Sequence, residues 1–475
     1  MENSDPDFPD EQEPNPLEEI LGAFLGPEAA AEAARQFNIQ GLDLSSLAGA
    51  LGGGTGGVPL GQLQYLFQTT KGPVNWKMVR DLATQQAYRS GDPTISAAEG
   101  RRVEQALTVA DLWLDPVTDF SAPDVVRETW TRVGWVEGTL DAWKQICEPV
   151  AENASRALAQ AMESELGDGS GGLPPELQQL AGSLSQALPR MSALAFGTQI
   201  GQALGAMSAT SLGPYDFGLP LGAPGLTALT LRNVEEFSDG LEIPADEVLQ
   251  FLAVRECAHA RLFAANPWLA PDLFQAVERY SQEIAIDTDA IAESARSIDF
   301  QDPESFNSAM AEGVFSPEPT EAQQRALLRL ETLLALIEGW VEAVTAKATT
   351  PYLPHAGQLR EMVRRRRVTG SSGEQLLAQL VGLQMRPRQA RGAAKLMEIV
   401  ENAQGAEARD NLWAHPDFIP TDEELQNPEG FLVSRAASKE TSDEFDAALE
   451  QLLEGTLGWA EGLGPETDPE DPPQA

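Results

Sequence analysis

The stretch "PADEVLQFLAVRECAHARLF", residues 244–263, predicts the helix around which the rest of the chain can be arranged. Pro244 suits a first helical turn, and the acidic residues that follow it complement the positive end of the helix dipole. The helix also offers an apolar face to a protein core, formed by Val248, Phe251, Leu252 and Leu262. Because positions i and i+4 project from one face of a helix, Arg255 and His259 should lie one above the other.

The segment "RECAH", Arg255–His259, differs by a single residue from HExxH, the zinc-peptidase signature. In that signature both histidines bind zinc and the glutamate activates a bound water. Glu256 stands at the glutamate position and His259 at the second histidine position. Arg255 stands at the first, and its guanidinium has no lone pair to give and would repel the ion. Taken alone, the segment is a weak signal and is more typical of an ordinary surface or packed histidine beside an Arg–Glu pair.

Composition limits the classes of partner. The chain has 475 residues, of which 42% are hydrophobic, with 32 Lys and Arg against 73 Asp and Glu, for a net charge of −41. This charge repels phosphate backbones and anionic membranes, so we expect no nucleic-acid partner. Cys147 and Cys257 are too few for a disulfide framework, which favours a reducing, cytoplasmic setting. We interpret Cys257, which points away from the Arg255/His259 face, as a small core residue. The N-terminal segment has no signal-peptide pattern.

Residues 191–212 contain no charged side chain, and Gly197, Gly201 and Gly205 follow one another at intervals of four. Such spacing is typical of closely packed helices, in membranes and elsewhere. The glutamines and hydroxyl groups of this segment would need partners in lipid, however, and few large apolar residues offset them. We therefore predict a tightly packed soluble helix and no stable membrane insertion.

The expected fold class is mainly α, with little strand and one large helical domain at residues 71–460. Helical periodicity is found at residues 75–90, 97–115, 123–147, 244–263 and 320–348. The best strand candidate is "LTALTLRNVEEF", residues 226–237. Residues 1–70, acidic and Gly-rich, and residues 461–475, acidic and Pro-rich, should be flexible. A division of the domain near 165–185 stays an alternative.

Several longer segments carry a family resemblance. They are "LAVRECAHARLFAANPWLAPDLFQAVERY" (252–280), "LLALIEGWVEAV" (333–344), "RRRRVTGSSGEQLLAQLVGLQMRPRQARGAAKLM" (364–397) and "LWAHPDFIPTDEELQNPEGF" (412–431). Together they resemble an actinobacterial hydrolase family of zincin-like metallopeptidases, over most of residues 70–435. A sister branch, associated with a deazaflavin coenzyme, carries an intact HExxH. This chain resembles the branch with RExxH in its place, which implies a zincin-like helical domain.

The resemblance assigns roles to particular residues. Glu256 falls on the general-base position and His259 on the second-ligand position, whereas Arg255 departs from the motif. In glutamate-type zincins the third ligand comes from a later helix. Glu338 in "ALIEGWVEA" is the first candidate, since an unpaired carboxylate would be costly in that apolar helix. Glu278 and Glu283 are the alternatives. Glu338 can instead be a buried salt-bridge residue with Arg255 as its partner.

Other residue groups are weaker candidates. His355 in "LPHAG" and His415 in "WAHPD" could replace the missing ligand from loops. Asp287 and Asp289 alternate in "IAIDTDAI", which is more typical of a solvated face than of a metal site. The run Arg364–Arg367 can bind phosphate, but in so acidic a chain we interpret it as a helix-end or salt-bridge cluster.

Two functions from different classes follow. The favoured one is a pseudoenzyme: a metal-free zincin-like scaffold in which Arg255 takes the place of the cation and a cleft binds an unidentified protein or peptide. The alternative is an active zinc-dependent peptidase, with Glu256 as general base and the zinc held by His259, Glu338 and an atypical further group. Zinc as a cofactor stays open between them.

Overall fold

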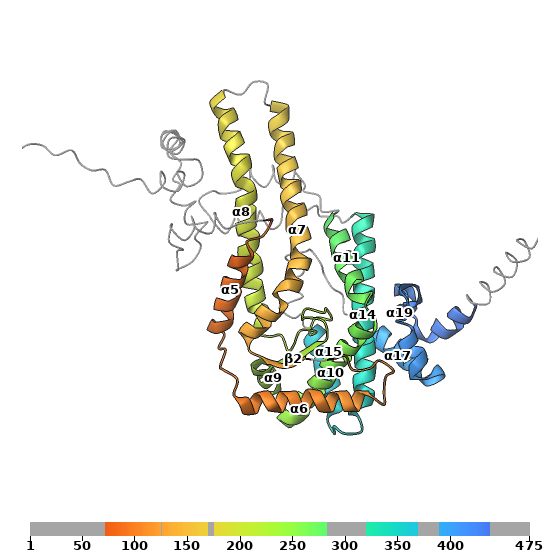
Figure 1. Ribbon diagram of the computed structural model, residues 1–475. Helices are drawn as coiled ribbons and strands as arrows, with labels where there is room; N and C mark the ends of the chain where they lie inside the picture. Colours follow the sequence, from red (N-terminus) through yellow and green to blue (C-terminus); the bar gives the residue numbers. More distant parts are fainter. Residues whose placement is uncertain (1–71, 125, 170–174, 283–319, 369–388, 438–475) are drawn as a thin grey trace, which may run out of the picture.

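The computed structural model describes residues 72–124, 126–169, 175–282, 320–368 and 389–437. Within these residues the chain is mainly α-helical, which confirms the predicted fold class (Figure 1). The side chains of residues 157–191 are not described, although most of that stretch is helical. The predictions for residues 1–70 and 461–475 lie outside the described residues.

The described elements are named as in Figure 1. The helices are α5 (Trp76–Arg89), α6 (Ala97–Leu114), α7 (Arg132–Gly169), α8 (Pro175–Ser208), α9 (Leu231–Ser238), α10 (Ala245–Ala265), α11 (Leu269–Gln282), α14 (Glu321–Thr349), α15 (Ala356–Val368), α17 (Ala390–Gln404), α18 (Ala406–Asn411) and α19 (Asp422–Gln426). Short 3-10 turns follow at η3 (Pro416–Phe418) and η4 (Pro428–Gly430). The strands β1 (Val126–Trp130) and β2 (Leu226–Thr230) pair in parallel, with Val126 opposite Leu226.

Helix α10 runs through the core. Every residue from Phe251 to Leu262 is buried, and the helix packs against α6, α14, β2 and α15. The helix begins at Ala245, and Pro244 is its N-cap residue. The sequence had suggested that Pro244 belongs to the first turn. Helix α14 begins at the predicted capping box, in which Thr320 and Gln323 bond each other's backbone N–H groups. These two helices hold the main candidate residues.

One predicted helix was partly wrong. Within residues 123–147 the first part is strand β1, and the helix α7 begins only at Arg132. Val126 and Thr129 are β-branched, and β1 lies beside the fully buried strand β2. Pairing with β2 therefore outweighs a local apolar pattern that is also compatible with a helix. The strand predicted at residues 226–237 was partly right: β2 ends at Thr230, and helix α9 begins at the next residue.

The uncharged segment at 191–212 lies mostly in α8, which packs closely against α5. A Cβ atom added at Gly197 would lie 3.2 Å from the Asn75 carbonyl oxygen, and one at Gly201 would lie 3.1 Å from that of Val79. These distances confirm the predicted close approach of a neighbouring backbone. No described helix joins the length and the apolar character needed to cross a membrane.

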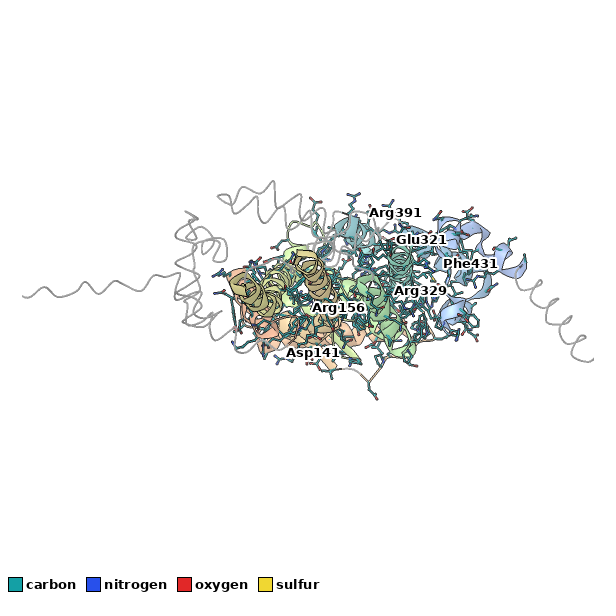
Figure 2. The ribbon with its side chains drawn as sticks, turned by 90° about the horizontal axis from the view of Figure 1, so that it is seen from above. Asp141, Arg156, Glu321, Arg329, Arg391 and Phe431 are labelled. Atoms are coloured by element: carbon teal, nitrogen blue, oxygen red, sulfur yellow. The ribbon has the colours of Figure 1, made fainter. Side chains whose placement is uncertain are left out.

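Helices α7 and α8 leave the body side by side as a long pair (Figure 1). Seen from above, α5 and α8 lie at one end of the molecule, and the C-terminal helices, with Phe431, lie at the other (Figure 2). The segment 165–185, where a division of the domain stays an untested alternative, contains the end of α7 at Gly169 and the start of α8 at Pro175. Of the helices of the candidate site, α10 lies below this pair, and α14 stands beside α11 (Figure 1).

Several of the few basic residues are used inside the protein. Arg261 of α10 has a 1% exposed side chain and bonds Asp111 and Asp115 of the α6 end, at 3.1 and 2.7 Å. Arg409 is fully buried and bonds Asp410 and Glu401, at 2.8 and 2.6 Å. Buried arginines with carboxylate partners thus tie helices together, and this use of arginine recurs at the candidate site.

Candidate functional site

Helices α10 and α14 bring together three of the residues singled out from the sequence. Nη2 of Arg255 lies 2.9 Å from Oε2 of Glu338, and Nε2 of His259 lies 3.1 Å from Oε1 of the same carboxylate. The three side chains are only 10%, 9% and 3% exposed, respectively. Arg255 and His259 do share a helix face, as their spacing required, and Glu338 faces them from the middle of α14.

A second arginine also binds this carboxylate. Nη2 of Arg367, at the end of α15, lies 2.5 Å from Oε1 of Glu338 and donates to the backbone oxygen of Asp216 at 2.9 Å. Burial alone would raise the pKa of Glu338, but Arg367, Arg255 and the His259 hydrogen bond together hold it well below its usual range. Glu338 is therefore ionised and forms ion pairs with two guanidinium groups, those of Arg255 and Arg367.

The His259 ring is held in one orientation. Its Nδ1 lies 2.8 Å from the carbonyl oxygen of Arg255, and a carbonyl can only accept, so Nδ1–H donates. Tyr215 stacks on the ring, with centroids 5.7 Å apart and planes 7° from parallel, and Phe263 stacks on the other end of this row. Burial lowers the pKa of His259, although its bond to Glu338 acts against that shift. These contacts leave Nε2 facing Glu338.

Glu256 faces a different neighbourhood. Its carboxyl group packs beside Gly213, where an added Cβ would lie 2.9 Å from Oε2. Oε1 is buried and has no hydrogen-bond partner among the described residues. Burial raises the pKa of Glu256 well above its usual value, and a backbone hydrogen bond at Ala228 and the charge of Arg255 only partly oppose this. Burial thus favours the neutral form of the Glu256 carboxyl group, which cannot take a proton from water.

A loop between α8 and β2 covers one side of the site. Asp216 in this loop binds Arg366 of α15 through both oxygens, at 2.8 and 2.9 Å, and accepts from the Leu212 backbone N–H at 3.1 Å. Arg366 also donates to the carbonyl oxygen of Thr210 at 2.6 Å. Burial would raise the pKa of Asp216, but Arg366 and its neighbours lower it. The loop that carries Tyr215 is thereby fixed to α15.

The remaining members of the arginine run are paired as well. Arg364 bonds Glu342, and Arg365 lies 3.0 Å from Glu361 on an exposed turn of α15. All four arginines thus have carboxylate partners, as the salt-bridge interpretation of the run expected. Sequence reasoning missed that Arg367 reaches Glu338, because only the packing of α15 against α14 brings them together.

The other candidates lie elsewhere. Glu278 is exposed on α11, where its carboxylate accepts from Gln282. His355 lies 3.1 Å from Glu247 at the start of α10, and His415 is an exposed residue near Asp417. None of these side chains bonds the Glu338 cluster, which consists of Glu338, Arg255, His259 and Arg367.

Cys257 is buried, with Sγ 3.5 Å from the Leu107 carbonyl oxygen, and burial raises the pKa of its thiol well above the usual value. It is thus a core residue, as predicted. Glu283, Asp287 and Asp289 lie outside the described residues.

The residues of the cluster do not fit a zinc ion in this arrangement. A catalytic zinc site needs three protein ligands and an open fourth position. His259 and Glu338 offer two, and both guanidinium groups already bind the glutamate. In the part of the chain that the structure describes, no group of three or more His, Cys, Asp or Glu side chains is arranged to hold a metal ion.

Comparisons with known proteins place this geometry in a family. A family model for zincin-like metallopeptidases matches residues 74–432, whereas no curated protein matches the chain. A solved structure from Chloroflexus aurantiacus, described as "a putative hydrolase with a novel fold", is similar with a TM-score of 0.54 and 17% identity, over 76% of this chain and 99% of that one. Such low identity shows a shared fold and nothing more. Because the family model covers most of its length, the chain belongs to the zincin-like metallopeptidase family.

Proposed function

We propose that this protein is a metal-free zincin-like scaffold that binds a peptide or protein ligand and does not cleave it. In this proposal Arg255 and Arg367 supply the positive charge that a zinc ion supplies in an active zincin. The family typically binds zinc, and the chain keeps the helix, the histidine and the glutamate through which such a site is built. It has exchanged the remaining ligand position for an arginine.

The observation that carries the proposal is the coordination of Glu338. Its carboxylate is bound at once by Arg255, Arg367 and His259. A zinc ion at this place would have to displace both guanidinium groups from a carboxylate that is 9% exposed. Breaking one buried ion pair typically costs about 3–5 kcal/mol, because the partner is left charged and unpaired. The free energy lost by breaking two such ion pairs would offset much of the free energy gained by binding zinc.

The state of Glu256 also supports a scaffold without hydrolytic activity. A general base must be ionised and within reach of the water whose proton it takes. Glu256 instead packs against Gly213 and β2, with a pKa raised chiefly by burial. Among the residues that the structure describes, no hydrogen bond or ion pair joins its carboxyl group to His259 or Glu338. It therefore lacks both the charge and the position for that task.

One observation favours the second candidate, an active zinc-dependent hydrolase. His259 donates from Nδ1 to a backbone carbonyl, at 2.8 Å, and this second contact is how zinc-binding histidines are commonly oriented. For activity, Arg255 and Arg367 would have to leave Glu338, and Glu256 would have to turn and ionise. The arrangement of the imidazole is thus compatible with zinc, but that of its neighbours is not.

Metal analysis separates the two functions. The full chain would be purified without chelators and without added metal, and its metal content would be measured by elemental analysis. The scaffold predicts far less than one equivalent of zinc, manganese, iron, nickel or cobalt. One tightly held equivalent, lost in a Glu338→Gln variant but kept in Glu278→Gln, would support the hydrolase and refute the scaffold. Glu278 is the matched control, since it is an exposed glutamate away from the cluster.

A further inference from the structure

The cluster around Glu338 is not electrically balanced. Arg255 and Arg367 are permanently positive, and between them lies a single ionised carboxylate. His259 contacts the same carboxylate and brings no negative charge in either protonation state. Asp216 and Arg366 form an ion pair of their own, so their charges cancel. The arginines and carboxylates of this group therefore leave one positive charge in the core of a strongly acidic protein.

Burial and the nearby charge of Arg255 both lower the pKa of the Arg367 guanidinium, while Glu338 and Asp216 raise it. The two guanidinium groups on Glu338 thus repel each other. Among the residues that the structure describes, Glu256 forms no ion pair with either of them. A further anion at the two guanidinium groups would relieve their repulsion.

Both arginines have N–H groups left over. Arg255 binds Glu338 through Nη2, and Arg367 uses its own Nη2 for Glu338 and for the Asp216 backbone oxygen. Their Nε and Nη1 groups form no hydrogen bond with any residue that the structure describes, and they are not among its fully buried, unsatisfied atoms. The side chains are 10% and 20% exposed. Each arginine side chain therefore keeps some contact with solvent.

We propose that the spare N–H groups of Arg255 and Arg367 bind the carboxylate of a monoanionic ligand. The inference rests on the proposed metal-free state of the site, since a metal on Glu338 would exclude this arrangement of the arginines. Guanidinium groups commonly bind carboxylates through paired N–H donors. Each arginine binds Glu338 through one Nη2 only, which leaves its other donors for a second carboxylate. A single negative charge would complete the balance of the cluster, whereas a dianion such as phosphate would overshoot it.

A row of aromatic rings continues from His259, which contacts the same carboxylate as the two arginines. Phe263, one turn after His259 on α10, is only partly buried and stacks on Tyr215, which in turn stacks on the histidine ring. A ligand that carries an apolar group next to its carboxylate could contact this row. The C-terminal residue of a peptide and a small free carboxylic acid both have that chemistry, and the experiment distinguishes them.

The test is isothermal titration of the full chain with three probes: acetate, the blocked peptide N-acetyl-Ala-Phe with a free C-terminal carboxylate, and the same peptide as its C-terminal amide. We expect the free-acid peptide to bind at least tenfold more tightly than the amide. Acetate binding as tightly as the peptide would identify a small carboxylate as the ligand. Equal binding of acid and amide, or no binding of either acid at millimolar concentration, would overturn the proposal.

Variants locate the site. Arg367→Gln should weaken binding of the free acid at least tenfold, while Arg365→Gln on the same helix should leave it unchanged, because Arg365 is 76% exposed and pairs with Glu361. Undiminished binding to Arg367→Gln would refute the assignment. Should that variant fail to fold, Arg367→Lys can replace it in the test. Lysine keeps the positive charge but lacks the paired N–H donors of the guanidinium, so this variant should bind the free-acid peptide several-fold more weakly.

Zinc analysis of the same samples separates the two proposals. If the protein is free of metal and does not bind the carboxylate probes, only the ligand proposal is refuted. If the purified protein holds one equivalent of zinc, both the scaffold proposal and the ligand proposal are refuted.

Discussion

Replacing Glu338 by glutamine should destabilise the protein more than replacing either arginine that binds it. The substitution removes one negative charge and leaves two guanidinium groups facing each other, with side chains only 10% and 20% exposed. Loss of one partner of a buried pair typically costs about 3–5 kcal/mol, and Glu338→Gln should fall in this range. Arg255→Ala should cost less, about 1–3 kcal/mol, because Glu338 keeps Arg367 and His259 as partners.

The double variant gives the sharper test. With Arg255 already removed, Glu338→Gln leaves only one arginine unpaired. The combined loss should therefore be smaller than the sum of the single losses by about 1–3 kcal/mol, the usual coupling of directly contacting residues. Urea unfolding of the full chain, followed by circular dichroism, measures these differences. Additive losses would refute the shared counter-charge.

Arg365→Ala is the control for this series. Its pair with Glu361 is exposed, and such pairs contribute at most about 1 kcal/mol. If Arg365→Ala cost as much as Arg255→Ala, the buried position of the cluster would not be the cause of its stability.

Three further results are expected. The folded-state pKa of Glu256 is raised, chiefly by burial, so its contribution to stability falls as pH rises above the unfolded value of about 4.3; Glu256→Gln should flatten that decline in unfolding measurements between pH 5 and 8. Gly213→Ala should cost about 1–3 kcal/mol, because its Cβ would lie 2.6 Å from a backbone oxygen of β2, whereas Gly357→Ala, with nothing within 4 Å, should cost nothing. Arg255→His should create a zinc site only when combined with Arg367→Gln, as titration of the single and double variants with zinc would reveal.

Local pattern predicted the helices of the site well. Arg255 and His259 share a face because helical spacing fixes it, and the capping box at Thr320 marked the start of α14. Glu338 could be singled out because a carboxylate inside an apolar helix needs a partner. The predictable part of the site is therefore what a single helix determines.

Contacts between distant segments could not be predicted in the same way. Arg367 belongs to a run of four arginines, and nothing in the run distinguishes the one that turns toward Glu338. Asp216 and Tyr215 lie in an irregular loop, whose path depends on tertiary packing and not on periodicity. Strand β1 cannot be distinguished from helix by its own sequence, because its stability comes from pairing with β2, about a hundred residues later in the chain.

The direct test of the metal-free account is zinc titration of the unmodified full chain, purified without chelators and analysed for metal beforehand. The account predicts a sample that holds no stoichiometric metal and shows weak binding or none in the titration, because Arg255 and Arg367 occupy Glu338. Tight one-to-one binding of zinc that disappears in Glu338→Gln, or one equivalent of zinc already present in the purified protein, would contradict it.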